Sequence, residues 1–199
     1  MANDEVLYEI KEGIAYITLN RPEKLNAINP EMRQMLWDSF QDVKNNPEVR
    51  CAIVTGKGRA FSTGHDLVAM ANARANEGPS TGDIYVVQSN IWKPIIAAVN
   101  GYALGGGLEL ALSCDIRIAS ENAQFFVAQT RMGRRPDGGL NFLLPRIVGV
   151  QKALELMWTA DRINAEEALR IGLVAKVVPA DDLMSVTMEL AERIAKGPS

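Results

Sequence analysis

Short apolar runs separated by polar turns open the chain. The runs Val6–Lys11 and Ile14–Leu19 are separated only by Glu12-Gly13, which predicts two strands joined by a tight hairpin. From Pro30 to Asn45, apolar residues recur at every third or fourth position. This spacing predicts an amphipathic helix, because residues three and four apart share one helical face.

Two continuous apolar runs, Cys51–Thr55 and Ile95–Val99, predict strands that are buried on both faces. Shorter runs predict further strands at Ile116–Ala119 and Gln124–Val127, and the stretch from 66 to 75 has a helical pattern. Because buried strands alternate with helices, the expected class is α/β, with the helices outside the strands.

The chain from Leu140 onward is predicted to be mainly helical, with one strand at Leu173–Val178. The segment 76–83, NEGPSTGD, is rich in glycine, proline, serine and threonine, which is typical of a surface loop or of a lid over a site. Residues 1–199 are expected to form one domain, since this length suits a single substantial core.

Composition and charge argue against several classes of function. The chain has 21 basic and 24 acidic residues and a net charge of −3, so neither nucleic acid nor a membrane is an expected partner. Cys51 and Cys114 lie in separate apolar contexts, which indicates two reduced, buried thiols. A single histidine argues against zinc, so no metal is expected. The sequence has no signal-peptide pattern or membrane-spanning run, and the expected location is cytoplasmic.

The stretch 101–115, GYALGGGLELALSCD, contains the strongest candidate for chemistry. Three consecutive glycines, Gly105–Gly107, open an apolar helix pattern, although glycine in a helix costs about 1 kcal/mol relative to alanine. Main-chain N–H groups at a helix start attract an oxygen that carries negative charge. Glu109 lies one turn into the helix, where it could exchange a proton with a bound carbonyl compound. A close crossing of two helices is the alternative explanation for the glycines.

A second glycine-containing turn, in the segment AFSTGHDL (60–67), could supply the other half of such a site. Gly64 and His65 follow an apolar strand and precede a predicted helix. Turns at the carboxyl ends of strands commonly bind ligands in α/β folds, and one N–H group from each turn would form an oxyanion hole. His65 is either a general base or a residue that contributes only its main-chain N–H, and we favour the second role.

Five segments resemble, in order and spacing, the enoyl-CoA hydratase/isomerase (crotonase) family. They are NRPEKLNAI (20–28), GRAFSTGHDL (58–67), KPIIAAVNGYALGGGLELALSCDIRIAS (93–120), GRRPDGGLNFLLPRIVG (133–149) and AEEALRIGLVAKVVP (165–179). The resemblance implies an α/β fold built as a spiral of ββα units, assembled as a homotrimer or homohexamer. It also implies an acyl-CoA thioester as the substrate, no cofactor, and a carbonyl oxygen that is held while an enolate forms.

Residue roles follow from the same resemblance. The two oxyanion-hole donors match the main-chain N–H groups of His65 and Gly106, and Glu109 matches the first of the two acid–base glutamates of the hydratases. The residues that match CoA-binding and acyl-tunnel positions are Lys24, Leu25, Ala27, His65, Asp66, Leu67, Val68 and Gly106.

The position of the second hydratase glutamate holds Gln129, which cannot exchange a proton as a carboxyl group does. Asp137, eight residues later, matches a catalytic aspartate of dienoyl-CoA isomerases and of a thioester dehalogenase branch. Two arrangements therefore compete: Glu109 and Asp137 transfer protons together, or Glu109 acts alone while Gln129 orients water. The segment Pro136–Gly139 is also an ordinary turn and helix-cap sequence, which would give Asp137 a structural role.

Three functions stay open at this level. The first is an enoyl-CoA hydratase, which adds water across the double bond of a 2-enoyl-CoA. The second is an enoyl-CoA or dienoyl-CoA double-bond isomerase, which needs no activated water and suits the loss of the second glutamate. The third is a catalytically weak protein that binds acyl-CoA. By the family pattern, the C-terminal helices that support trimer packing are expected to be short or missing after Ser199.

Overall fold

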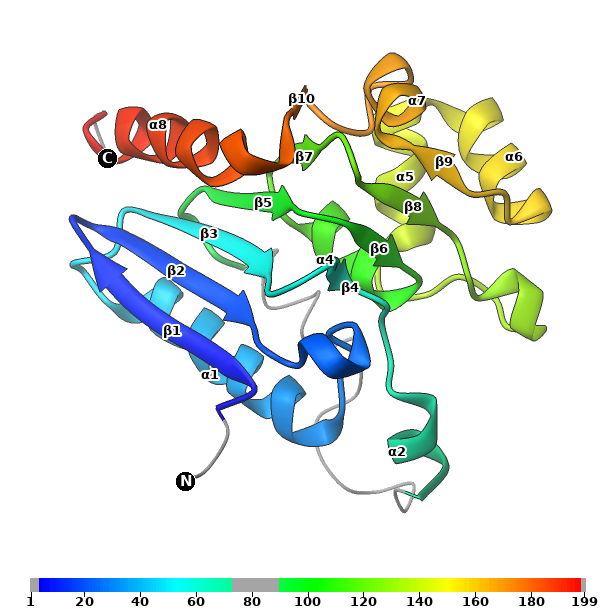
Figure 1. The fold of residues 1–199 in the computed structure, drawn as a ribbon, viewed down its shortest axis with the longest axis horizontal. Helices are drawn as coiled ribbons and strands as arrows, with labels where there is room; N and C mark the ends of the chain where they lie inside the picture. The colour runs from blue at the N-terminus through cyan, green and yellow to red at the C-terminus, as the bar shows by residue number, and fades with distance from the viewer. Residues whose placement is uncertain (1–3, 73–89, 198–199) are drawn as a thin grey trace.

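The computed structural model describes residues 4–72 and 90–197, which form two β-sheets covered by helices (Figure 1). The larger sheet has six strands in the order β1-β2-β3-β5-β7-β10. Its first two strands are the predicted antiparallel hairpin, and the other neighbours pair in parallel. The strands are β1 (Val6–Lys11), β2 (Ile14–Leu19), β3 (Cys51–Gly56), β5 (Ile95–Val99), β7 (Ile116–Ser120) and β10 (Lys176–Val178).

Alternate residues of the central strands point to opposite faces of this sheet, and each face has its own helix. Ala52 of β3 belongs to the larger apolar core, together with the buried side of α1 (Pro30–Asn45). Cys51 points the other way and packs in a second apolar cluster with α8 (Leu183–Ala195). Because both faces are covered, the central strands read as continuous apolar runs, and the predicted α/β class is confirmed.

The second sheet brings the two glycine-containing turns to one edge. Its four strands, in spatial order, are β4 (Ala60–Ser62), β6 (Tyr102–Leu104), β8 (Gln124–Phe126) and β9 (Ile163–Asn164). The apolar pattern predicts none of β4, β6 and β9, because each has only two or three residues. β4 and β6 pair in parallel, so their carboxyl ends lie at the same edge. The turns that follow Ser62 and Leu104 therefore start side by side.

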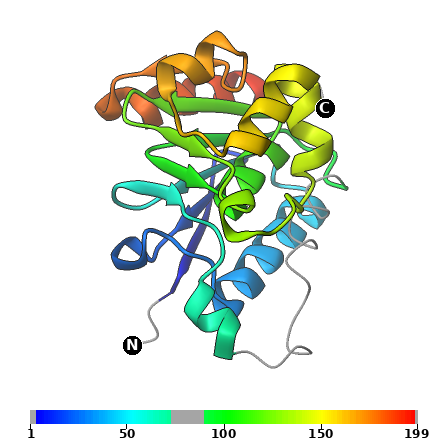
Figure 2. The same cartoon turned by 90° about the vertical axis from the view of Figure 1, so that its right-hand side faces the viewer.

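The remaining helices lie around these sheets. Figure 2 shows α2 at one end of the molecule and α5 and α6 at the other. These remaining helices are α2 (Leu67–Asn72), α4 (Gly106–Ser113), α5 (Leu140–Val148), α6 (Val150–Thr159) and α7 (Ala165–Arg170). Short 3-10 turns lie between the helices and strands, namely η1 (Pro22–Lys24), η2 (Thr130–Met132) and η3 (Ala180–Asp182). Within residues 4–72 and 90–197, no helix combines the length and apolarity needed to cross a membrane.

The last strand of the larger sheet is shorter than the sequence predicts. The strand predicted at Leu173–Val178 begins only at Lys176, because the N–H groups of Leu173 and Val174 donate to the carbonyl oxygen of Ala168 and close the turn after α7. Apolar character at those two positions reflects burial in a turn rather than a strand. The loop predicted at 76–83 lies outside the described residues.

Arg117 on β7 is a buried cation that holds the carboxyl end of α4. Its guanidinium donates to the carbonyl oxygens of Cys114 (2.7 Å) and Ala111 (3.3 Å), and to that of Leu173 beyond α7 (2.8 Å). Arg117 is only 9% exposed. The last carbonyl groups of a helix lack partners within the helix, and a cation there also interacts favourably with the helix dipole. Arg117 therefore fixes α4 against the larger sheet.

Replacing Arg117 by leucine should lower the free energy of unfolding by about 2 to 4 kcal/mol, because buried carbonyl groups lose their donor. Equilibrium urea unfolding measures this loss. Arg170→Leu is the matched control, since that side chain is 68% exposed in its ion pair with Glu167, and its removal should change the free energy of unfolding much less than Arg117→Leu does. A loss for Arg117→Leu no larger than that of the control would contradict this role.

Candidate functional site

Steric constraints explain why two of the three consecutive residues at the start of α4 are glycines. Gly105 has a φ of +51°, in the region that favours glycine, and it is the N-cap of α4. A Cβ atom at Gly107 would lie 2.0 Å from the carbonyl oxygen of Ser62 at the end of β4. The close approach at Gly107 is therefore between α4 and a strand, and the alternative of a helix crossing is wrong for this residue.

The turn after β4 packs directly on the first turn of α4. Gly64 has a φ of +84°, and a Cβ atom there would lie 2.6 Å from the main-chain nitrogen of Gly106. Any other residue at position 64 would be strained and would collide with Gly106. Glycine thus lets the main chains of the two turns touch, which places His65 and Gly106 in one small region.

The main-chain N–H of His65 is directed by a short parallel bridge with Ile28. The N–H of Ile28 donates to the carbonyl oxygen of Gly64 (2.7 Å), and the N–H of Asp66 donates to the carbonyl oxygen of Ile28 (3.0 Å). In this pattern the residue between the two partners turns its own N–H away from the bridge. The N–H of His65 donates to no acceptor in residues 4–72 and 90–197, so a ligand oxygen can use it.

Glu109 and Gln129 form a buried pair. Glu109 is 1% exposed and Gln129 is 3% exposed, and Gln129 Nε2 donates to Glu109 Oε1 at 2.5 Å. The other two oxygens, Glu109 Oε2 and Gln129 Oε1, are buried and accept no hydrogen bond from the described part of the chain. Because buried polar atoms are costly to leave unpaired, Gln129 Oε1 can accept a hydrogen bond from a ligand or a water, whereas Glu109 Oε2 donates one when the carboxyl group is protonated and accepts one when it is ionised.

The protonation state of Glu109 is set by its surroundings. Burial, and next the negative charge of nearby Asp137, raise the pKa of Glu109 to about 8, while the hydrogen bond from Gln129 acts in the opposite direction. At neutral pH the carboxyl group is therefore mainly protonated. A buried acid with such a pKa can donate a proton, and strongly shifted acids of this kind are concentrated in active sites.

Asp137 approaches Glu109 from the loop before α5. Its side chain is 40% exposed and makes an ion pair with Arg134 at 3.5 Å. The N-cap of α5 is Gly139, and no side chain donates or accepts a capping hydrogen bond there. The main-chain oxygen of Asp137 accepts from the N–H of Leu140 (2.8 Å), as in an ordinary turn. The structural explanation therefore holds for the main chain of Asp137, whereas its carboxyl group is not a helix cap.

The His65 side chain is a poor candidate for a base. Burial, and next the positive charge of Arg134, lower the pKa of His65. A lower pKa makes the imidazole a weaker base at neutral pH. This environment favours the role in which His65 contributes its main-chain N–H.

The two predicted binding segments lie next to each other. The Ile28 bridge joins the segment 24–27 to the turn at His65, and Arg21 strengthens this junction by pairing with Asp66 (3.2 Å) and donating to the carbonyl oxygen of Ala27. Lys24 is exposed, and Leu67 and Val68 are 54% and 73% exposed at the start of α2. Lys24, Leu67 and Val68 are thus exposed on two segments that the Ile28 bridge joins beside the His65 turn.

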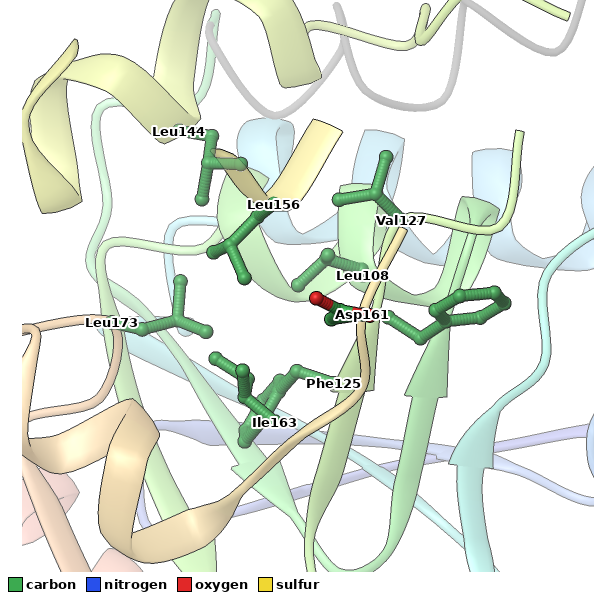
Figure 3. Close-up of a pocket in the computed structure, with 9 residues that line it drawn as sticks. Leu108, Phe125, Val127, Leu144, Leu156, Asp161, Ile163 and Leu173 are labelled. Atoms are coloured by element: carbon green, nitrogen blue, oxygen red, sulfur yellow. The ribbon is translucent and has the colours of Figure 1, made fainter. Parts of the chain in front are cut away.

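An apolar pocket lies between α4, α5 and α6, and none of the predicted site residues lines it. Figure 3 shows Leu108 of α4, Leu144 of α5 and Leu156 of α6 pointing into a common space, with β8 and β9 below them. Its volume is about 10 Å³, enough for a single water, and the other labelled residues are Phe125, Val127, Asp161, Ile163 and Leu173. The pocket is thus part of the packing that holds α4 in place.

No group of histidine, cysteine, aspartate and glutamate side chains in residues 4–72 and 90–197 could hold a metal ion. Cys51 and Cys114 are buried and neither is in a disulfide bond, as predicted.

The sequence patterns single out neither Asn26 nor Ser62, although both are buried beside the site. Asn26 Nδ2 donates to the carbonyl oxygens of Lys57 (3.0 Å) and Ala60 (2.7 Å), and Ser62 Oγ donates to that of Asn26 (2.7 Å). The available signal is weak: each is a polar residue in an otherwise apolar segment. Its meaning depends on contacts between segments that are far apart in the sequence.

Comparison with known proteins is consistent with this geometry. A family model described as enoyl-CoA hydratase/isomerase matches residues 9–199. Crotonyl-CoA hydratase of Syntrophomonas wolfei and short-chain-enoyl-CoA hydratase of Clostridium acetobutylicum are each 41% identical to this chain, over 98% of it and 76% of their own length. The crystal structure of enoyl-CoA hydratase from Bacillus anthracis matches with a TM-score of 0.92 at 33% identity, over 98% of this chain and 78% of that one. The chain therefore belongs to the enoyl-CoA hydratase/isomerase family, whose crotonase-like fold it has.

Proposed function

We propose that this protein is an enzyme that binds a 2-enoyl-CoA and adds water to it through an enolate of the thioester. The observation that carries the proposal is the buried Glu109, held one turn from a helix start that touches the Gly64-His65 turn. Relatives named for hydration of crotonyl-CoA and of short-chain enoyl-CoA support the reaction class and a short acyl chain.

Substrate binding would place the thioester oxygen at the two main-chain donors. The N–H groups of His65 and Gly106 would stabilise the negative charge that develops on this oxygen, and the positive end of the α4 dipole would add to them. Removing one such donor typically costs on the order of 3 kcal/mol of transition-state stabilisation. CoA would lie along Lys24, Leu25 and Ala27, and the acyl tunnel would run past the segment 65–68.

The proton transfers can be balanced with two carboxyl groups. The oxygen of a water molecule bonds to the β-carbon, and its proton passes to the carboxylate of Asp137. The electron pair of the double bond moves onto the thioester as an enolate, which then takes a proton from Glu109 at the α-carbon. Because the two carboxyl groups lie close together, Asp137 can return its proton to Glu109 and restore the starting state. Gln129 holds Glu109 in place through its hydrogen bond.

A double-bond isomerase is the second candidate, and Gln129 is the observation that favours it. With an amide where the hydratases have their second glutamate, the site has one fewer carboxyl group near the water position. Isomerisation moves a proton from one carbon to another and needs no water. The same two donors and the same Glu109–Asp137 pair would serve that reaction.

Further properties are proposed on the same basis. The reaction needs no cofactor, the protein is cytoplasmic, and residues 1–199 form one domain that assembles as a homotrimer or homohexamer. Exposed apolar side chains on α5 and α6, namely Phe142, Val150 and Trp158, support assembly, because such groups are commonly covered by a partner.

Purified protein incubated with crotonyl-CoA should remove the absorbance of the conjugated thioester and give a product heavier by one water. Incubation with 3-enoyl-CoA tests the second candidate, because an isomerase conserves mass. If the protein turns over neither substrate but still binds acyl-CoA, both enzyme functions are wrong and the protein is a catalytically weak acyl-CoA-binding protein.

Asp137→Asn should lower kcat by about 100-fold with little change in KM, because Glu109 is protonated and a separate base is required. The wild-type kcat/KM should fall as pH rises through about 8, where Glu109 loses its proton. The matched control is Asp181→Asn in the exposed turn η3, which should keep wild-type activity. If Asp137→Asn behaves like the control while Gln129→Ala is inactive, the arrangement with Glu109 alone and a water held by Gln129 is correct instead.

Glu109→Gln should change the pH dependence of stability. The folded pKa of about 8 lies above the value of 4.5 for a free glutamate, so this group stabilises the fold below pH 4.5 and loses that contribution as pH rises through 8. Between pH 4.5 and pH 8.5, the free energy of unfolding of the variant should rise relative to that of the wild type by on the order of 3 to 5 kcal/mol. Urea unfolding of both proteins at both pH values measures this change. If the free energies of unfolding of variant and wild type differ by the same amount at both pH values, the raised pKa is refuted.

A further inference from the structure

We infer that Ser62 is a positioning residue for the oxyanion hole, because its hydroxyl group orients the turn that presents the N–H of His65. The inference rests on the proposed function, since it assumes that this N–H binds a thioester oxygen. It adds to that function a residue that touches neither the substrate nor the reacting atoms.

The Ser62 hydroxyl makes two hydrogen bonds in a fully buried position. Oγ donates to the carbonyl oxygen of Asn26 at 2.7 Å and accepts from the N–H of Gly64 at 3.1 Å. Ser62 is 0% exposed. Its hydroxyl group therefore has both a fixed acceptor and a fixed donor, and it determines the direction of the Gly64 N–H.

The next peptide unit is held from its other side. The carbonyl oxygen of Gly64 accepts from the N–H of Ile28 at 2.7 Å. In a planar trans peptide the N–H points opposite to the carbonyl group, so the N–H of His65 must point away from Ile28. Gly64 has a φ of +84° and no side chain to restrict it. The two hydrogen bonds on either side of Gly64 therefore replace the restriction that a side chain would give.

Ser62 also contacts the segment of the second donor. Its carbonyl oxygen lies against Gly107, where a Cβ atom would be only 2.0 Å away, and its own Cβ would be 2.9 Å from that atom. Gly107 follows Gly106 in the first turn of α4. One buried residue thus touches both turns, and through Asn26 it also reaches the loop proposed to bind CoA.

Alanine at position 62 would fit the same space but would leave the Gly64 N–H and the Asn26 carbonyl group without partners. A buried N–H without an acceptor is unfavourable, and the flexible Gly64 can rotate to relieve it. Such a rotation would turn the His65 N–H away from the thioester oxygen. The expected effect is a poorer oxyanion hole in a folded protein.

The experiment compares Ser62→Ala with Ser39→Ala. Ser39 is also buried, and its hydroxyl donates to a main-chain oxygen, that of Met35 at 2.7 Å, but within α1. With crotonyl-CoA, Ser62→Ala should lower kcat about tenfold and change KM less than about twofold, since a misdirected donor affects the charged transition state most. Ser39→Ala should keep the wild-type kcat.

A second readout does not depend on turnover. Infrared difference spectra of butyryl-CoA labelled with ¹³C at the thioester carbonyl report hydrogen bonding, because stronger hydrogen bonds lower the stretching frequency. Binding to the wild type and to Ser39→Ala should lower the frequency by the same amount, and Ser62→Ala should show a smaller shift.

The outcomes separate this inference from the proposed function. If the wild type binds butyryl-CoA with the lowered frequency but turns over no enoyl-CoA, the proposed function is wrong. A smaller shift in Ser62→Ala would still support the role of Ser62 in that case. A wild-type kcat and a full shift in Ser62→Ala overturn the inference and leave the function intact. No shift in the wild type overturns the inference together with the oxyanion hole.

Discussion

The contact between the Gly64 turn and the first turn of α4 is the constraint on which the rest of the site depends. The close approach needs residues without a Cβ atom at two points, because a Cβ at Gly64 would collide with the nitrogen of Gly106 and a Cβ at Gly107 would collide with the carbonyl oxygen of Ser62. Parallel pairing of β4 with β6 brings the turns to the same edge, and Arg117 holds the far end of α4. Strand pairing, helix anchoring and glycine placement thus all act on one contact.

The electrostatics of the site follow from burying α4 on all sides. Glu109 is buried among apolar neighbours and lies near the negative charge of Asp137, so the neutral form of its carboxyl group is favoured, although the hydrogen bond from Gln129 acts against this. Asp137 comes from a more exposed loop and pairs with Arg134. The two carboxyl groups therefore lie in different surroundings, one buried and one partly exposed.

The sequence predicted the elements whose residues follow a regular period, and it missed those that depend on pairing. The hairpin, α1 and the two central strands agree with the apolar pattern, because each is buried in a way that its own residues reveal. β4 and β6 are too short to have a period and exist because they pair with each other. Gly64 and Glu109 stand out as residue types, whereas Ser62 matters only through partners from other segments.

Placing both proposed oxyanion donors on the main chain has an evolutionary consequence. Any substitution at His65 other than proline changes the side chain but keeps the N–H group, so the proposed capacity to stabilise an enolate would survive it. The proposed acid and base, by contrast, are side chains that a single codon change can exchange. A scaffold of this kind can keep one carbonyl-binding site while the proton chemistry beside it diverges.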